Sequence, residues 1–174
     1  MNRRALHFAL AYSAFFILFK LSIILGGFAL TRFGFYFSNI TAFFCVVPFY
    51  ILAVKGVRDK EQGGTISGRE AMRITLTVFA VSAIIISIYH YIEFEMVGKQ
   101  LAAEYYRSQQ FLDFLKLQVK VKPEDYEKVI QQQIAGSDTA AFQATTGKLF
   151  SFMIIGLGAA FITSALMKRR VIQR

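Results

Sequence analysis

The residues that could do chemistry in this chain are a few charged and polar side chains inside long apolar segments. Lys20 lies in a run from Phe15 to Leu25 whose only other polar residue is Ser22. A charged side chain at the centre of a bilayer costs roughly 2.5–3.5 kcal/mol, so such residues usually face a bundle interior, reach toward an interface or serve transport. We therefore expect Lys20 to make a polar contact within the membrane.

Three groups on later segments are candidate partners for the Lys20 ammonium. His90 and Glu93 are three residues apart, so they share one face of a helix. Pro48 has no N–H, so the carbonyl of Phe44 loses its helical partner and needs another donor in the membrane. At 1.5 Å per residue, Lys20 lies about 22 Å along its helix, near the depth of His90 and Phe44, with Glu93 about one turn beyond. Three roles remain open for Lys20: a structural contact, snorkelling toward an interface, and a transport or proton-relay function.

The chain shows no pattern typical of an enzyme. It contains no phosphate-binding loop, nucleophile elbow or zinc-binding HExxH sequence. A carboxylate-bridged metal centre in a helix bundle needs carboxylates from facing helices, and only one such group lies near His90. The single cysteine, Cys45, excludes an intramolecular disulfide and lies among apolar residues. We therefore predict no catalytic residue, no metal and no cofactor.

Four apolar segments must position these residues. The expected helices cover about residues 5–31, 36–54, 70–92 and 147–167. Each contains a run close to the roughly 20 apolar residues that a membrane-spanning helix requires. The chain is 55% hydrophobic, above the range of about 45–50% for soluble domains. These features predict an all-α integral membrane protein, with residues 1–174 forming one membrane domain.

The distribution of charge predicts the topology. The formal net charge is +9, and most of the excess lies before residue 5, within residues 55–73 and after residue 167. Lysine and arginine in short loops stay in the cytoplasm, so both termini of this multi-pass membrane protein are expected there. This basic collar should attract anionic lipid at the cytoplasmic face. No basic groove with stacking aromatics is evident, which argues against a nucleic-acid partner.

Residues 93–146 are too polar to cross a bilayer and predict an extracytoplasmic helical hairpin between the third and fourth spans. The apolar positions of its first half fall on one face of a single helix: Leu101, Tyr105, Leu112, Leu115 and Val119. Phe111 and Phe114 lie off that face, so we expect them to be available for binding a partner. Asp138 is placed to cap the last helix.

Two further patterns concern helix packing and helix ends. Gly156, Ala160 and Ser164 recur every four residues in the last span, which suits close helix packing within the bundle or in a dimer. Ser67 and Glu70 have the spacing of a capping box, which predicts the start of the third membrane helix.

The loop before the third span contains three short motifs, with a polar segment and a basic end further along the chain. They are Arg58-Asp59-Lys60, Gly63-Gly64-x-Ile66-Ser67, Glu70-Ala71, residues 121–134, and Lys168-Arg169-Arg170. Together they resemble an uncharacterised bacterial family of four-span inner-membrane proteins, domain of unknown function 4199. The resemblance implies four spans with a polar helical insertion between the third and fourth. It transfers no catalytic residue, because the family has no established activity.

Little intramembrane polarity and a polar outer hairpin favour a non-enzymatic accessory or scaffold subunit. Such a subunit would bind other proteins of a membrane complex, or a second copy of itself. The alternative is a small transporter or channel component that uses Lys20 and the face formed by His90 and Glu93. A third hypothesis is an enzyme acting on lipid at the outer interface, with His90 and Glu93 in a cleft open to lipid.

Overall fold

The computed structural model describes residues 2–117 and 122–168, and the regular elements in this part of the chain are helices. Four helices there are long and apolar enough to cross a membrane. They are Arg3–Leu25, Phe33–Glu61, Gly68–Arg107 and Ala141–Met167. This confirms the expected class, an all-α integral membrane protein with four membrane-spanning helices.

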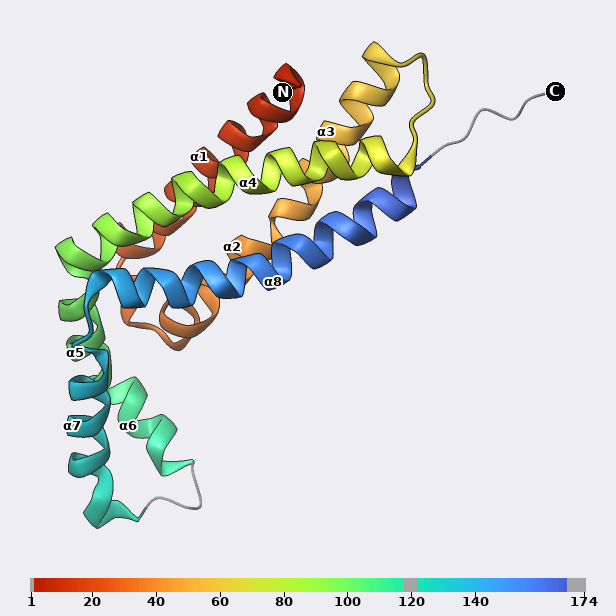
Figure 1. Ribbon diagram of the computed structural model, residues 1–174. Coiled ribbons are helices and arrows are strands. Elements are labelled where there is room, and N and C mark those ends of the chain that lie inside the picture. The colour runs from red at the N-terminus through yellow and green to blue at the C-terminus, as the bar shows by residue number, and fades with distance from the viewer. Residues whose placement is uncertain (1, 118–121, 169–174) are drawn as a thin grey trace.

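The four helices form one bundle around α4 (Gly68–Glu93), which packs against α1 (Arg3–Leu25), α3 (Val46–Glu61) and α8 (Ala141–Met167). Figure 1 shows the N-terminus, the loop between α3 and α4, and the end of α8 at one end of this bundle. We name this the terminal end. The helices between α4 and α8 project from the opposite end, which we name the insertion end.

The helix starts at the terminal end have side-chain caps. The Asn2 carboxamide oxygen accepts hydrogen bonds from the N–H groups of Arg4 and Ala5 at the start of α1. Ser67 caps α4, because its Oγ accepts from the Glu70 N–H at 3.2 Å. The Glu70 carboxylate accepts a hydrogen bond from the Gln62 side chain, so it does not complete the expected capping box.

The second membrane helix is longer and less regular than its apolar run suggests. It begins with a π-helical turn at Phe33–Phe37, continues as α2 (Ser38–Phe44), and is interrupted at Cys45 before α3. Pro48 explains the interruption, because it cannot donate to the Phe44 carbonyl. The helix continues to Glu61, whose carboxylate lies 2.6 Å from Arg4 Nε on α1. This contact explains why the helix extends past the apolar residues.

The bundle core is rich in aromatic residues with hydrogen-bonded hydroxyls. Tyr12 donates to the Ala42 carbonyl at 3.0 Å, and Tyr50 donates to the Gly156 carbonyl at 3.2 Å. Phe152 packs among these rings. Because a buried hydroxyl without a partner is costly, these bonds let tyrosine occupy the bundle interior.

The small residues of the last span face inward. A Cβ at Gly156 would lie 2.6 Å from the Phe79 ring on α4, so glycine is needed for this close approach. Ala160 is fully buried, and Ser164 Oγ lies 3.0 Å from Thr75 Oγ1 on α4. Gly156, Ala160 and Ser164 therefore pack within the bundle and are not exposed for dimer formation.

The insertion consists of α5 (Lys99–Arg107), α6 (Gln109–Lys116), a 3-10 turn (Pro123–Asp125) and α7 (Tyr126–Ser137). α4 leads into α5 through a π-helical turn at Phe94–Gly98. Tyr105 of α5 stacks on Phe35, with ring centroids 4.1 Å apart, which joins the insertion to the start of the second membrane helix.

The expected single helix over residues 101–119 is wrong. The chain breaks at Ser108, which is extended (φ −72°, ψ 155°) and caps α6. This break rotates the following positions, so Phe111 is buried with 3% exposure against Tyr105 and Tyr106. Phe111 is therefore not available to a partner. Val119 lies outside the described residues.

Two further details of the insertion differ from or refine the sequence analysis. Phe114 is half-buried, with the Arg32 guanidinium 5.0 Å from its ring centroid. The expected cap of the last helix by Asp138 is also wrong, because Ala140 occupies the cap position. The Asp138 carboxylate instead lies 2.8 Å from Lys99 Nζ, and this ion pair ties the end of α7 to α5.

Candidate functional site

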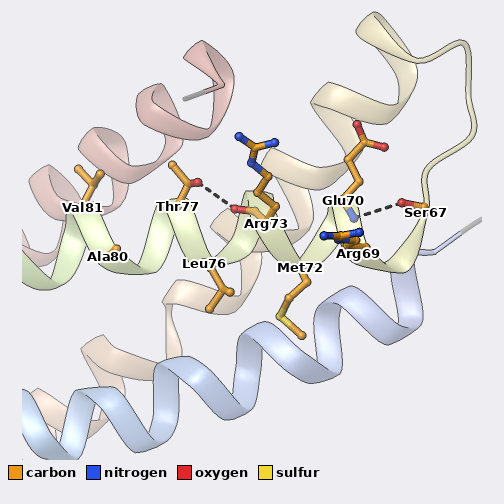
Figure 2. A pocket seen from close by; sticks show the side chains of 9 residues that line it. All are labelled: Ser67, Arg69, Glu70, Met72, Arg73, Leu76, Thr77, Ala80 and Val81. Atoms are coloured by element: carbon orange, nitrogen blue, oxygen red, sulfur yellow. Dashed lines mark hydrogen bonds between the residues drawn. The ribbon is translucent and has the colours of Figure 1, made fainter.

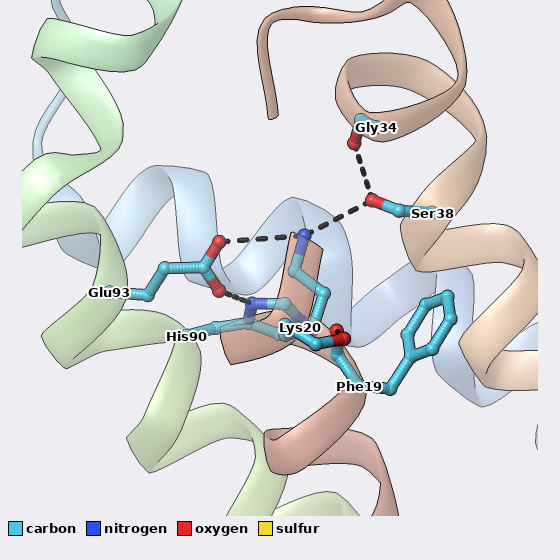
Figure 3. Close-up of polar contacts among 7 residues, drawn as sticks. Phe19, Lys20, Gly34, Ser38, His90 and Glu93 are labelled. Carbon is cyan, nitrogen blue, oxygen red and sulfur yellow. Dashed lines mark hydrogen bonds and ion pairs between the residues drawn. The ribbon is translucent and has the colours of Figure 1, made fainter. Parts of the chain in front are cut away.

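A buried ion pair joins α1 to α4 near the insertion end. Lys20 is 5% exposed, and its Nζ lies 3.5 Å from Glu93 Oε1. The same ammonium donates to Ser38 Oγ on α2 at 3.2 Å (Figure 3). Three helices that are distant in sequence therefore meet at one positive charge.

His90 occupies the other side of the carboxylate. Its Nδ1 lies 3.1 Å from Glu93 Oε2, so each oxygen of Glu93 has a nitrogen partner (Figure 3). The rings of Phe16 and Phe43 meet the imidazole edge-on, at 5.4 and 6.3 Å between centroids. His90 Nε2 is buried and has no hydrogen-bond partner among residues 2–117 and 122–168.

Irregular backbone positions Ser38. Its hydroxyl donates to the Gly34 carbonyl within the π-helical turn that precedes α2. A Cβ at Gly34 would lie 1.9 Å from the Phe28 carbonyl oxygen, so the close approach of these two segments requires glycine. A second π-helical turn begins directly after Glu93. Such turns are rare and frequently occur at functional sites.

The ion pair borders a cavity of about 220 Å³ between the membrane helices and the insertion. Lys20 and Glu93 line its inner part, and Leu101 and Thr139 line it from the insertion. Lys148 on α8 is a further lining residue. The cavity therefore lies where five parts of the chain meet: α1, the start of the second membrane helix, α4, the insertion and α8.

Lys148 changes the charge balance of this cavity. Its charge interacts with those of Glu93 and Lys20. In the part of the chain that the structure describes, Lys148 has no hydrogen bond and no carboxylate within ion-pair distance. Two ammonium groups thus face one carboxylate, and one positive charge is uncompensated while His90 is neutral.

The structure places the residues of the expected intramembrane contact as follows. Lys20, His90 and Glu93 lie together. The Phe44 carbonyl does not join them, because the contact of Lys20 on the second span is the Ser38 hydroxyl. Sequence reasoning missed Ser38 and Lys148. Both are polar residues at the edge of an apolar run, a signal that could have identified them.

A second hollow, of about 870 Å³, runs along the first half of α4. Figure 2 shows Arg69 and Arg73 in its lining near the start of the helix, and Leu76 and Ala80 further along. Glu70 lies between the two arginines, so the lining changes from charged, with a net positive charge, to mainly apolar along the helix. No group of three or more His, Cys, Asp or Glu that could hold a metal lies within the described ranges.

These features define a polytopic all-α membrane protein with a buried ion pair beside a cavity at one end of the bundle. A family model matches residues 4–169, and the chain belongs to that family, Protein of unknown function (DUF4199). No curated protein and no solved structure matches the chain.

Proposed function

We propose that this protein binds a small polar solute in the cavity beside Lys20 and Glu93, as a component of a transport or channel system. The observation that supports this most strongly is the buried ion pair at the cavity wall. Desolvating two charges is costly, and a well-packed apolar replacement is often at least as stable. We therefore infer that a buried ion pair at the wall of a cavity serves solute binding rather than stability.

We propose that the termini and the loop between α3 and α4 are cytoplasmic and that the insertion is extracytoplasmic, in a bacterial inner membrane. Arg3 and Arg4, the basic residues of 55–73 and Lys168 all belong to the terminal end, which supports this orientation. The cavity would then lie on the outer side. Reporter fusions at Gln110 and at the C-terminus test this orientation, and a cytoplasmic signal from position 110 would contradict it.

An accessory or scaffold subunit is the competing proposal. Its sequence argument was the low polarity of the spans and the polar outer hairpin, with Phe111 and Phe114 as the expected contact residues, and Phe111 is buried. The other candidate contact, the seam of Gly156, Ala160 and Ser164, is occupied by packing against α3 and α4. The geometry therefore favours solute binding over a scaffold role.

We also propose that the hollow along α4 holds an anionic phospholipid of the cytoplasmic leaflet. Arg69 and Arg73 would contact the headgroup, at about 1 kcal/mol for each basic residue near the surface. The apolar residues further along would contact an acyl chain. Arg69→Gln/Arg73→Gln should lower the amount of anionic lipid retained on purification, measured by native mass spectrometry. Arg107→Gln/Lys128→Gln, which neutralises two exposed charges in the insertion, should not.

The solute proposal is tested by ligand retention. Protein purified in mild detergent is incubated with the small-molecule fraction of host cells and measured by native mass spectrometry. We expect a bound species on the wild type and none on Lys20→Met/Glu93→Gln. The matched control Lys116→Met/Asp113→Asn removes an exposed pair of the insertion and should retain the species.

Two results would contradict the solute proposal. One is an unliganded wild type, and the other is equal occupancy in the wild type and the double variant. Partner proteins that co-purify in either case would favour the accessory role.

A further inference from the structure

We infer that the solute of this cavity is a small anion, held between Lys148 and Lys20. This inference rests on the proposed solute binding and adds the chemical class of the ligand. It follows from the inventory of charged and hydrogen-bonding groups at the cavity wall.

Both oxygens of the carboxylate in the cavity already have a nitrogen partner. Glu93 Oε1 faces Lys20 Nζ at 3.5 Å, and Glu93 Oε2 faces His90 Nδ1 at 3.1 Å. A cation entering the cavity would meet two ammonium groups, one carboxylate that already has two partners, and the side-chain oxygen of Asn39, which has no partner among the described residues. The net positive charge of these groups therefore disfavours a cationic ligand.

The positive groups, in contrast, have unused donors. An ammonium has three N–H donors, and those of Lys20 have two partners, Glu93 and Ser38. Lys148 lines the same cavity with no partner among the described residues. An anion between the two lysines would accept these donors and neutralise the excess charge.

The dimensions limit the ligand to a small one. The cavity of about 220 Å³ corresponds to a few water molecules, each of which has about 30 Å³ of liquid volume. Acetate and inorganic phosphate are of suitable size. The cavity lies between the membrane helices and the insertion, with Leu101 and Thr139 in its lining, so its volume suits a free small anion better than a whole lipid headgroup.

The charge preference can be measured by thiol labelling. Thr139→Cys places a thiol at the cavity wall, and Thr146→Cys places one on the exposed face of α8 as a matched control. Both are made in a Cys45→Ala background, because Cys45 is the only native cysteine. The two reagents are methanethiosulfonates of similar size, one with a sulfonate and the other with a trimethylammonium group.

The measured quantity is the labelling rate of the sulfonate reagent divided by that of the trimethylammonium reagent. We expect this ratio to be at least about tenfold higher at position 139 than at position 146. A cleft lined by one sign of charge raises the local concentration of counter-ions by about this factor or more. Lys148→Gln should abolish the preference, and Lys128→Gln, which changes an exposed lysine of α7, should preserve it. Sodium acetate or sodium phosphate should protect position 139 from labelling.

The outcomes separate this inference from the proposed function. Equal labelling by both reagents, or protection by tetramethylammonium and not by acetate or phosphate, would overturn the anion inference. A solute adduct in native mass spectrometry would then still support solute binding. No labelling at position 139 by either reagent, together with no adduct, would overturn both.

Discussion

Removing both charges of the Lys20–Glu93 pair should destabilise the protein by less than the sum of the two single removals. Lys20→Met keeps most of the side-chain volume and removes the charge. Glu93→Gln keeps the shape and removes the opposite charge. The side chains of Lys20 and Glu93 are only 6% and 9% exposed, so solvent does little to screen the charge that is left.

The contacts of Glu93 predict unequal single costs. Breaking a buried pair costs about 3–5 kcal/mol. Lys20→Met leaves the carboxylate with His90 and near the charge of Lys148, so its cost should lie near the lower value. Glu93→Gln leaves two lysines facing each other with no carboxylate, so its cost should lie near the upper value. The double variant should cost no more than Glu93→Gln alone. The sum of the two single costs would then exceed the cost of the double variant by about 3 kcal/mol, which is the coupling energy.

Thermal unfolding in detergent measures these differences. For a chain of this length, about 1 kcal/mol corresponds to roughly 2–4 °C in Tm. Lys20→Met should therefore lower Tm by about 6–12 °C and Glu93→Gln by more. The exposed pair of Lys116 and Asp113, 2.9 Å apart, provides the matched double-mutant cycle and should show no measurable coupling.

Additive single effects in the Lys20–Glu93 cycle would refute this reasoning. So would a smaller loss for Glu93→Gln than for Lys20→Met, because Lys148 would then exert no repulsion on Lys20. Either result would also weaken the charge inventory on which the anion inference depends.

Two other predictions concern a close helix contact and an exposed ion pair. Gly156→Ala should destabilise the bundle by about 1–3 kcal/mol in thermal unfolding, because its Cβ would lie 2.6 Å from the Phe79 ring. The control Gly158→Ala, whose Cβ meets nothing within 4 Å, should cause no loss of stability. The hydrogen bond from Lys99 lowers the pKa of Asp138. The pair therefore stabilises the insertion at pH values above the ordinary aspartate pKa of about 3.9. This contribution is lost as the pH falls through the lowered pKa. The protection of α5 amides from hydrogen exchange, relative to the intrinsic exchange rate at each pH, should therefore fall below about pH 4 in the wild type. Asp138→Asn should show the lower protection already at pH 7.

The fold class and the meeting of Lys20 with Glu93 could be predicted from the sequence because both depend on regular helix geometry. Apolar runs of sufficient length indicate the spans, and the constant rise per residue places Lys20 near the depth of His90, about one turn from Glu93. Span length and depth along a helix are both summed over many residues, so a small irregularity in one turn does not change them.

The surroundings of the pair could not be predicted, because they depend on single departures from that geometry. The extended Ser108 rotates Phe111 into the insertion core, and no glycine or proline marks this break. The π-helical turn before α2 brings Ser38, and not the Phe44 carbonyl, to the Lys20 ammonium. Lys148 is far from Lys20 in sequence, and only the packing of α8 places both at one cavity.

The two π-helical turns connect the irregular backbone to the proposed solute site. One turn contains Gly34, whose carbonyl orients Ser38 toward Lys20, and the other begins at Phe94, directly after Glu93. π-helix accounts for well under 1% of residues in soluble proteins, so two such turns beside one ion pair are unlikely to reflect helix packing alone. The second turn also joins α4 to α5, so a change in its winding would move Glu93 relative to Leu101 across the cavity. Solute binding between the lysines and movement of the insertion would then be coupled through the same five residues, Phe94–Gly98.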